Sequence, residues 1–331
     1  MEKRILKWGI LGTGRIAGVM ATALKVVENS ELYAVGSRSE EKAHEFATQY
    51  KIPKAYGSYE ALVSDPDVDI IYIATPHNLH LENALLAMNK GKHVLCEKPL
   101  AVNEKEVRQL IEKAAEKKVF LMEALWSRFL PRIIKVKELV DSGELGDIRM
   151  LTAAFCFKSS HRPEQRHFNI DLCGGTILDI GIYNIFLSYL ILGKPQEISS
   201  MAVLNNQGAD TTSSYTFMYP NEVLAIMHSS FLVDAPVAAE IHGTKATLML
   251  DDRWFNVGSV RVKYPEEAKE DVYKFDVKAN GYEYEAQEAV NCILAGKIQG
   301  DLWSWNNSLE LVRIMDSIRS ACGIIYPKHD Y

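Results

Sequence analysis

The regular alternation of strand-like and helical patterns between Lys7 and about Phe120 is the feature that most constrains how this chain can fold. Strands that alternate with helices in this way form parallel sheets with helices on both faces. We therefore predict a doubly wound α/β domain in this half. The predicted strands are residues 6–11, 32–35, 70–74, 93–96 and 119–121, and the predicted helices are 14–26, 39–50, 59–62, 81–90 and 104–117.

The pattern changes after about Pro131, where one helix (131–142) is followed by strand-like runs without intervening helices. Such runs imply a predominantly antiparallel open sheet in an α+β domain. We place the domains at 1–125 and 126–331, with the last helix free to pack back on the first domain. The predicted later elements are strands 148–157, 198–204, 212–218, 223–231, 238–242, 246–250 and 260–264, and helices 284–295 and 309–321.

Composition excludes several classes of protein. The chain has 331 residues, 47% of them hydrophobic and 24% charged, which is typical of a globular protein of two domains. Its net charge is −6, and no basic run marks a nucleic-acid surface. No stretch approaches the ~20 apolar residues of a membrane span, and the start leaves no room for a signal peptide. The five scattered cysteines fit a reducing compartment, so we expect a cytoplasmic location.

A glycine-rich turn joins the first predicted strand to the first helix. Gly12 permits the tight turn, Gly14 lets the backbone approach a pyrophosphate, and small Ala17 allows the helix to pack closely on the strand. The helix N-terminus then presents unpaired N–H groups to the phosphates. We predict a Rossmann dinucleotide site in which the turn residues contact the cofactor: Gly12, Thr13, Gly14, Arg15 and Ile16.

The end of the second strand indicates which dinucleotide is bound. An NAD site usually has an acidic residue here, whereas this chain has Ser37, Arg38 and Ser39, with Lys42 as a possible second cation. Arg38 can pair with a 2′-phosphate, and the hydroxyl groups can donate hydrogen bonds to it. The alternative is a solvated helix start capped by Ser39. We predict NADP as the cofactor, with NAD less favoured.

The third strand ends in a polar segment expected beside the nicotinamide end of the crevice. Its cofactor-positioning residues are Thr75, Pro76, His77, Asn78 and His80. The two histidines have a spacing that metal ligands can use on a helix. No third ligand cluster supports them, and we predict no metal site.

Three residues far apart in the sequence are candidates for the chemistry. Lys98, within Glu97-Lys98-Pro99, follows a buried strand at the sheet edge where ligands bind. Asp179 and Tyr183 are four residues apart after a double glycine, so they share a helical face. The alternative is a helix whose early Asp complements the helix dipole and whose Tyr is buried for packing.

Hydride transfer from an alcohol needs a base for the hydroxyl proton. Tyr183 can serve if its pKa falls by ~3 units from the tyrosine reference of ~10, which takes about 4 kcal/mol. An ammonium at ~4 Å in an effective dielectric near 20 supplies about that much. Asp179 at the same distance would cancel the effect, so we expect Asp179 to orient the substrate hydroxyl or to hold Lys98.

These motifs resemble, in order and spacing and over nearly the whole chain, the glucose–fructose oxidoreductase / inositol dehydrogenase / MocA-like family. The segment from Met122 to Pro131, Tyr284-Glu285-Ala286 and Pro327 are similar to the branch with dimeric dihydrodiol dehydrogenase, which also oxidises D-xylose with NADP. The resemblance implies that Lys98 and Tyr183 form the catalytic pair with Asp179 nearby. It also implies a homodimer or homotetramer formed through the C-terminal sheet. Thr176 departs from the family pattern, since some members have a third glycine there.

The resemblance further implies that Trp126 and Arg128 lie near the nicotinamide and substrate, with Phe155 lining the same pocket. Substrate hydroxyl contacts are expected from loop residues such as His161, Arg162, Arg166 and Asn169. We therefore expect an NADP-dependent dehydrogenase acting on a sugar, polyol or vicinal diol. Two alternatives remain open: a non-catalytic nucleotide-sensing regulator of the same fold, and a ketone reductase that works in the opposite direction.

Overall fold

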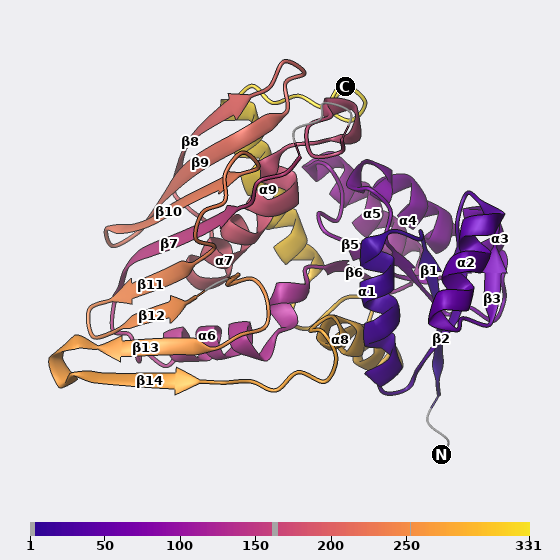
Figure 1. Cartoon of the computed structure of the whole chain (residues 1–331), viewed down its shortest axis with the longest axis horizontal. Coiled ribbons are helices and arrows are strands. Elements are labelled where there is room, and N and C mark those ends of the chain that lie inside the picture. Colours follow the sequence, from indigo (N-terminus) through magenta and orange to yellow (C-terminus); the bar gives the residue numbers. More distant parts are fainter. Residues whose placement is uncertain (1–3, 161–164, 252) are drawn as a thin grey trace. The chain divides into compact units, whose positions relative to one another are not determined.

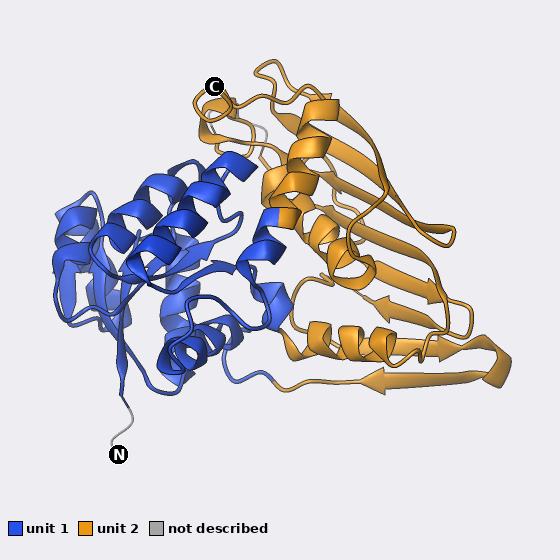
Figure 2. Cartoon of the chain, turned by 180° about the vertical axis from the view of Figure 1, so that it is seen from behind, with its two compact units in different colours: residues 1–129, 277–309 blue, residues 130–276, 310–331 orange. Residues whose placement is uncertain are grey.

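The computed structural model describes residues 4–160, 165–251 and 253–331. The chain divides into two compact units, coloured separately in Figure 2. Unit 1 comprises residues 1–129 and 277–309, and unit 2 comprises residues 130–276 and 310–331. Each unit is built around one sheet, and the two sheets differ in strand direction.

Unit 1 contains a six-stranded parallel sheet in the order β3-β2-β1-β4-β5-β6. Figure 1 shows helices on both of its faces, as the α/β alternation predicts. The strands are β1 (Leu6–Leu11), β2 (Ser30–Gly36), β3 (Lys54–Tyr56), β4 (Ile70–Ile73), β5 (His93–Glu97) and β6 (Leu121–Ala124). The helices are α1 (Arg15–Ala23), α2 (Glu40–Tyr50), α3 (Tyr59–Ser64), α4 (His80–Asn89), α5 (Glu104–Lys117) and α8 (Glu283–Leu294).

Strand register brings the chemistry-bearing segments of unit 1 to one sheet edge. Leu11 of β1 pairs with Ile73 of β4, and Ile73 pairs with Cys96 of β5. The residues that follow these strands therefore leave the sheet side by side at its carboxyl edge, where α/β folds bind ligands. This edge lies at the point where the strand order reverses, between β1 and β4.

Unit 2 contains an eight-stranded sheet in the order β14-β13-β12-β11-β7-β10-β9-β8. Its pairs are antiparallel except for the central pair of β7 and β10, which is parallel. The predicted mainly antiparallel sheet is therefore confirmed. The strands are β7 (Ile148–Cys156), β8 (Glu197–Leu204), β9 (Asp210–Tyr219), β10 (Val223–Ser230), β11 (Ala239–Gly243), β12 (Thr247–Leu250), β13 (Val260–Tyr264) and β14 (Lys269–Tyr273). The remaining helices are α6 (Pro131–Asp141), α7 (Ile182–Leu192) and α9 (Trp305–Ala321).

The two faces of this sheet have different surroundings. Along β10 burial alternates, so that Ala225 and Met227 are buried against the helical side while Leu224 and Ile226 are 40% and 44% exposed. Further exposed apolar side chains on the neighbouring strands are Met201, Val203, Leu204 and Met218. The described chain thus covers one sheet face with helices such as α7 and leaves apolar side chains on the other.

Some elements lie where the sequence pattern gave no signal. The strand predicted at 119–121 is observed as β6, which lies later in the chain, at Leu121–Ala124. Helix α9 begins at Trp305 rather than at residue 309. The short strands β3 and β14 were not predicted. Neither has an apolar run, and no residue of either is buried, so only their pairing with a neighbouring strand defines them.

One stretch corrects the expectation that no segment reaches membrane-spanning length. The helical segment Ile170–Leu192 is long and apolar enough by composition, yet 78% of its most apolar window is buried inside the protein. A core helix meets the same criteria as a membrane span. We interpret this segment, which ends in α7, as part of the buried core of unit 2.

Candidate active site

The glycine turn of unit 1 has the geometry of a phosphate cradle. Gly12 has a φ of +111°, and a Cβ there would lie 3.2 Å from the carbonyl oxygen of Ala74. Gly14 precedes α1 without a side-chain cap, and a Cβ added to it would meet nothing within 4 Å. The first turn of α1 also carries no acidic residue. Its N–H groups can therefore receive an anion, which fits a pyrophosphate.

The hydroxyl oxygens of Ser37 and Ser39, which follow β2, accept hydrogen bonds from backbone N–H groups. Arg38 interacts with the side chain of Tyr59. The hydroxyl oxygen of Ser39 caps α2 by accepting from the N–H of Lys42 at 3.3 Å, as the capping alternative predicted. The Ser37 oxygen accepts from the N–H of Ser39 at 3.3 Å. Burial raises the pKa of Tyr59, against the opposing charge and hydrogen bond of Arg38. Arg38 therefore lies near the Tyr59 side chain at the start of α3.

The polar segment after β4 is tied to the segment after β5. His80 is buried, and its two ring nitrogens lie 2.7 Å from the Pro99 carbonyl oxygen and 3.0 Å from that of Thr75. The imidazole of His80 therefore connects the backbone of the segment after β4 to that of the segment after β5. Among the described residues Oδ1 of Asn78 is buried without a hydrogen-bond partner. Such an acceptor fits a donor from a bound ligand.

Glu97 fixes the backbone from which Lys98 projects. Its carboxylate accepts from the backbone N–H of Lys98 at 3.2 Å and from the hydroxyl of Tyr72. Glu123 of β6 lies close by: burial raises its pKa, and the charge of Lys98 opposes that rise. The Glu123 carboxylate also accepts from the N–H of Leu100 at 2.9 Å. The Lys98 segment is therefore held by buried carboxyl groups on two strands.

A second buried glutamate faces Glu97. Glu285, in the first turn of α8, has no exposed surface, and neither of its oxygens has a hydrogen-bond partner among the described residues. Burial and then the charge of Glu97 raise the pKa of Glu285 well above its usual range. The folded protein therefore holds the Glu285 proton more tightly than the unfolded chain does. No local pattern indicates this pairing, because the two residues are far apart in the chain.

Replacing Glu285 by Gln should stabilise the protein increasingly as the pH rises. A raised folded-state pKa means that the folded protein keeps a proton that the unfolded chain loses above about pH 4.3. The contribution of Glu285 to the free energy of unfolding therefore falls by up to about 1.4 kcal/mol for each pH unit, until the pH reaches the folded-state pKa. Gln removes this dependence. Urea unfolding from pH 5 to 8 measures the difference in free energy of unfolding between Glu285→Gln and wild type. A difference that stays constant across that range would contradict the raised pKa of Glu285.

The aromatic residue predicted near the nicotinamide is packed within unit 1. Trp126 is 5% exposed and stacks on Tyr282, with ring centroids 4.4 Å apart and planes 12° apart. Nε of Arg128 donates to the carbonyl oxygen of Leu302 at 3.0 Å. Tyr282 and Glu285 are residues that sequence reasoning did not assign to the site. Their segment is linked to this region only through tertiary packing.

In unit 2, Asp210 anchors the helix that carries Asp179 and Tyr183. Its Oδ2 accepts from the backbone N–H groups of Thr176 and Ile177 at 2.9 and 3.0 Å. It also accepts from the hydroxyls of Thr176 and Ser213 at 2.5 and 2.7 Å. A Cβ at Gly175, whose φ is +136°, would collide with Oδ1 of Asp210. Thr176 thus supplies a hydroxyl to this anchor where some family members have glycine.

Asp179 lies in a π-helical turn (Ile177–Gly181) that leads into α7. Nη2 of Arg166 donates to its two oxygens at 3.2 and 3.1 Å. Nε2 of His167 lies 3.4 Å from Oδ2 of Asp179. The predicted substrate residue Arg166 therefore contacts the predicted acid directly. His167 was not among the sequence-predicted residues.

Tyr183 is 6% exposed and lies among aromatic rings. Its ring centroid is 5.6 Å from that of Phe155 and 5.2 Å from that of Phe255, and these two rings stack at 4.1 Å. Arg132 holds the segment that carries Phe255, donating to the carbonyl oxygens of Asp251 and Asn256 at 3.0 and 3.2 Å. An apolar wall beside a hydroxyl group suits a substrate with one flat, weakly polar face.

The candidate residues divide between the units, and each group is described within its own unit. Lys98 belongs to unit 1, whereas Asp179 and Tyr183 belong to unit 2. His161 and Arg162 lie outside the described residues. Asn169 caps a short turn, since its Oδ1 accepts from the N–H of Asp171 at 2.9 Å.

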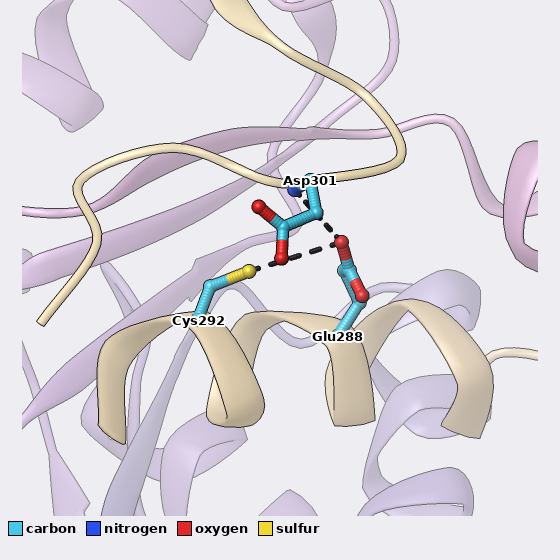
Figure 3. Close-up of side chains that lie close together, drawn as sticks. All are labelled: Glu288, Cys292 and Asp301. Carbon is cyan, nitrogen blue, oxygen red and sulfur yellow. Dashed lines mark hydrogen bonds between the residues drawn. The ribbon is translucent and has the colours of Figure 1, made fainter. Parts of the chain in front are cut away.

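A further cluster in unit 1 contains Glu288, Cys292 and Asp301 (Figure 3). The Glu288 carboxylate accepts from the N–H of Asp301 at 2.9 Å and from the Cys292 thiol at 3.8 Å. Lys297 pairs with Asp301 at 2.6 Å. Burial, and then the charge of Glu288, raise the pKa of Cys292 to about 11, so its sulfur stays a thiol. These contacts close the loop after α8, and we assign the cluster that structural role.

Comparison with known proteins identifies the class defined by this fold and site. Residues 6–125 match the oxidoreductase family with an NAD-binding Rossmann fold, and residues 133–249 match the GFO/IDH/MocA C-terminal domain. The chain belongs to the Gfo/Idh/MocA family of NAD(P)-dependent oxidoreductases, as its motifs predicted.

Relatives of this chain match it over nearly the full length of both proteins. The chain is 37% identical to trans-1,2-dihydrobenzene-1,2-diol dehydrogenase of Mus musculus, covering 98% of each protein. It is 34% identical to the Homo sapiens enzyme of the same name, again covering 98% of each.

Two solved structures share the architecture. Aldose-aldose oxidoreductase from Caulobacter crescentus, complexed with glycerol, has a TM-score of 0.87 at 25% identity, covering 97% of this chain and 98% of that one. A 3-ketoreductase from Actinomadura kijaniata with NADP and TDP-benzene has a TM-score of 0.86 at 25% identity, covering 96% and 98%.

Proposed function

We propose that this protein is an NADP-dependent dehydrogenase that oxidises a CH–OH group of a sugar or vicinal diol. The observation that carries the proposal is the position of Tyr183 against the aromatic pair Phe155 and Phe255 in unit 2, on the helical segment that also carries Asp179. A phenol and a carboxylate on one helical face can each take one hydroxyl of a polyol. The dihydrodiol substrate in the relatives' names fits an apolar wall.

NADP, when bound, accepts the hydride from the substrate carbon. Tyr183 takes the hydroxyl proton, and Lys98 stabilises the phenolate form of Tyr183. Asp179, held by Arg166, orients the substrate hydroxyl. The first unit binds the dinucleotide through the turn from Gly12 to Ile16, and the second supplies the substrate surface.

Arg38 supports the preference for NADP over NAD. It extends from the end of β2, where NAD-specific sites usually have a carboxylate that excludes a 2′-phosphate. The remaining proposed cofactor contacts are the polar segment after β4, Glu97, Lys98, Trp126 and Arg128. The unpartnered buried acceptor of Asn78 supports a ligand at that segment.

We also propose that the apolar sheet face of unit 2 joins copies of this chain into a homodimer or homotetramer. Contiguous exposed apolar side chains on a sheet mark association surfaces, and here they include Met201 at 76% and Val203 at 58% exposure. Sedimentation velocity distinguishes the states, and a monomer at micromolar concentration would contradict the proposal. A cytoplasmic location is the compartment that the five scattered cysteines support.

A spectrophotometric panel tests the activity. We expect NADPH formation with cyclic vicinal diols and aldoses, and slower turnover when NAD replaces NADP. The reverse assay, with the matching hydroxyketone and NADPH, measures the ketone reductase alternative. Tight NADP binding without turnover of any sugar, diol or ketone in either direction would contradict the proposed activity and favour a nucleotide sensor.

A further inference from the structure

His167 connects the buried acid of the substrate surface to a half-buried hydroxyl group. Its Nε2 lies 3.4 Å from Oδ2 of Asp179, and its Nδ1 lies 2.8 Å from Oγ of Ser159. Nη2 of Arg166 is 3.5 Å from the same Nε2. An imidazole with a polar partner on each nitrogen can accept a proton on one side and release a proton from the other.

The ring of His167 is fixed between these partners by aromatic packing. It stacks on Phe231 with centroids 4.7 Å apart and meets the edge of Phe157 at 5.7 Å. Burial decreases along the series: the side chain of Asp179 is 8% exposed, whereas that of His167 is 23% exposed. The line from Asp179 through His167 therefore runs from the protein interior toward solvent.

The proposed function creates a need for such a line. Oxidation of an alcohol releases a proton together with each hydride, and Tyr183, which takes that proton, is only 6% exposed. The phenol must lose the proton to water before the next turnover. Tyr183 and Asp179 are one helical turn apart, at a Cβ separation of about 5–6 Å. A second hydroxyl of the substrate that accepts from the phenol and donates to the carboxylate, at about 2.7 Å from each oxygen, can link the two groups.

We propose that Asp179, His167 and Ser159 form a proton relay, and that the substrate is a vicinal diol whose second hydroxyl links Tyr183 to it. This inference rests on the proposed function. The reacting O–H gives its proton to the Tyr183 phenolate as the hydride leaves the carbon. Tyr183 passes the proton to the second hydroxyl oxygen, whose own proton moves to Asp179.

The remaining transfers complete the balance. Asp179 protonates Nε2 of His167, Nδ1 releases its proton to Oγ of Ser159, and the Ser159 hydroxyl releases one proton to water. Each transfer breaks one O–H or N–H bond and forms another. The net release is one proton for each hydride transferred, and exchange with water returns the His167 proton from Nε2 to Nδ1 before the next turnover. His167 acts through Asp179 and is therefore a positioning and relay residue rather than a catalytic one.

The variant His167→Gln separates a relay from a structural role. Glutamine can hydrogen-bond to both Asp179 and Ser159, but it cannot carry a proton between them. In weakly buffered solution with a cyclic vicinal diol and NADP, we expect kcat to fall by at least about tenfold. Added imidazole should restore it in a saturable manner, while wild type stays insensitive to imidazole.

His242 provides a matched control in the same unit. Its Nε2 lies 3.2 Å from Glu240, its Nδ1 lies 3.3 Å from the Thr247 hydroxyl, and its side chain is 28% exposed. His242→Gln should therefore keep wild-type turnover in every buffer. Ser159→Ala keeps the imidazole but removes the last hydroxyl, so it should show a similar buffer-dependent loss.

The outcomes separate the relay from the activity itself. Active wild type with His167→Gln equally fast at all buffer concentrations would overturn the relay, as would a loss that imidazole does not restore. Absence of turnover in wild type would instead contradict the proposed function. The wild-type preference for a cyclic vicinal diol over the matching mono-alcohol should narrow in His167→Gln. An unchanged preference would overturn the part assigned to the second hydroxyl.

Discussion

Replacing Lys98 by Met should lower kcat by about a thousandfold while leaving the Kd for NADP within a few-fold of wild type. An ammonium near the phenol stabilises the phenolate by about 4 kcal/mol, and positioned proton transfer contributes factors of about 10² to 10⁴. Methionine keeps the length of the side chain without its charge. Initial rates with a cyclic vicinal diol, together with fluorescence titration of NADP, measure the two quantities.

Lys105→Met is the control for this variant, because Lys105 is an exposed lysine of α5 outside the proposed site. It should retain wild-type rates. Unchanged turnover in Lys98→Met would defeat the assignment of Lys98. A parallel loss of NADP binding and turnover would reduce Lys98 to a cofactor-binding residue.

Asp210→Ala should reduce the free energy of unfolding by about 4 kcal/mol. It leaves several donors without their buried acceptor, and each unsatisfied group costs about 1–3 kcal/mol. These donors are the N–H groups of Thr176 and Ile177 and the hydroxyls of Thr176 and Ser213. Urea unfolding followed by circular dichroism measures the loss.

Asp210→Asn keeps an acceptor oxygen and should be the milder change, at about 1–2 kcal/mol. Asp234→Ala removes one exposed acceptor, which takes a hydrogen bond from the N–H of Lys158 at 2.9 Å, and should cost less than about 1 kcal/mol. If Asp210→Ala unfolds at nearly the same urea concentration as Asp234→Ala, Asp210 is not the anchor of the helix that carries Asp179 and Tyr183.

Local patterns were sufficient for most of the fold. The apolar runs and helical spacings located the central strands of unit 1 because β1, β4, β5 and β6 are buried on both faces. The predicted turn at 219–222 is observed between β9 and β10, where Asn221 and Glu222 both have a φ of +62°. Edge strands with few apolar residues were not predicted. Strand β14 has the sequence Lys-Glu-Asp-Val-Tyr; it pairs with β13, and none of its residues is buried.

The site was predictable where a motif dictates the backbone and unpredictable where partners come from elsewhere. Gly12 has the positive φ that the predicted turn needs, and Asp179 and Tyr183 lie on one helical segment as their spacing indicated, while their roles stay predictions. His167 gave no signal, because its importance depends on the contact with Asp179. Phe255 likewise joins Phe155 only through the folding of a loop held by Arg132.

The sequence by itself determined the two architectures, the dinucleotide turn and the identity of the groups that can do chemistry. These depend on the periodicity of nearby residues and on backbone conformations that glycine permits. Only the tertiary structure decided which of those groups are buried, charged or joined. The pKa of Glu285 is raised because folding buries it near Glu97, and its oxygens have no hydrogen-bond partner among the described residues. Hydrogen bonding and burial depend on distances between remote segments, and no local pattern encodes those distances.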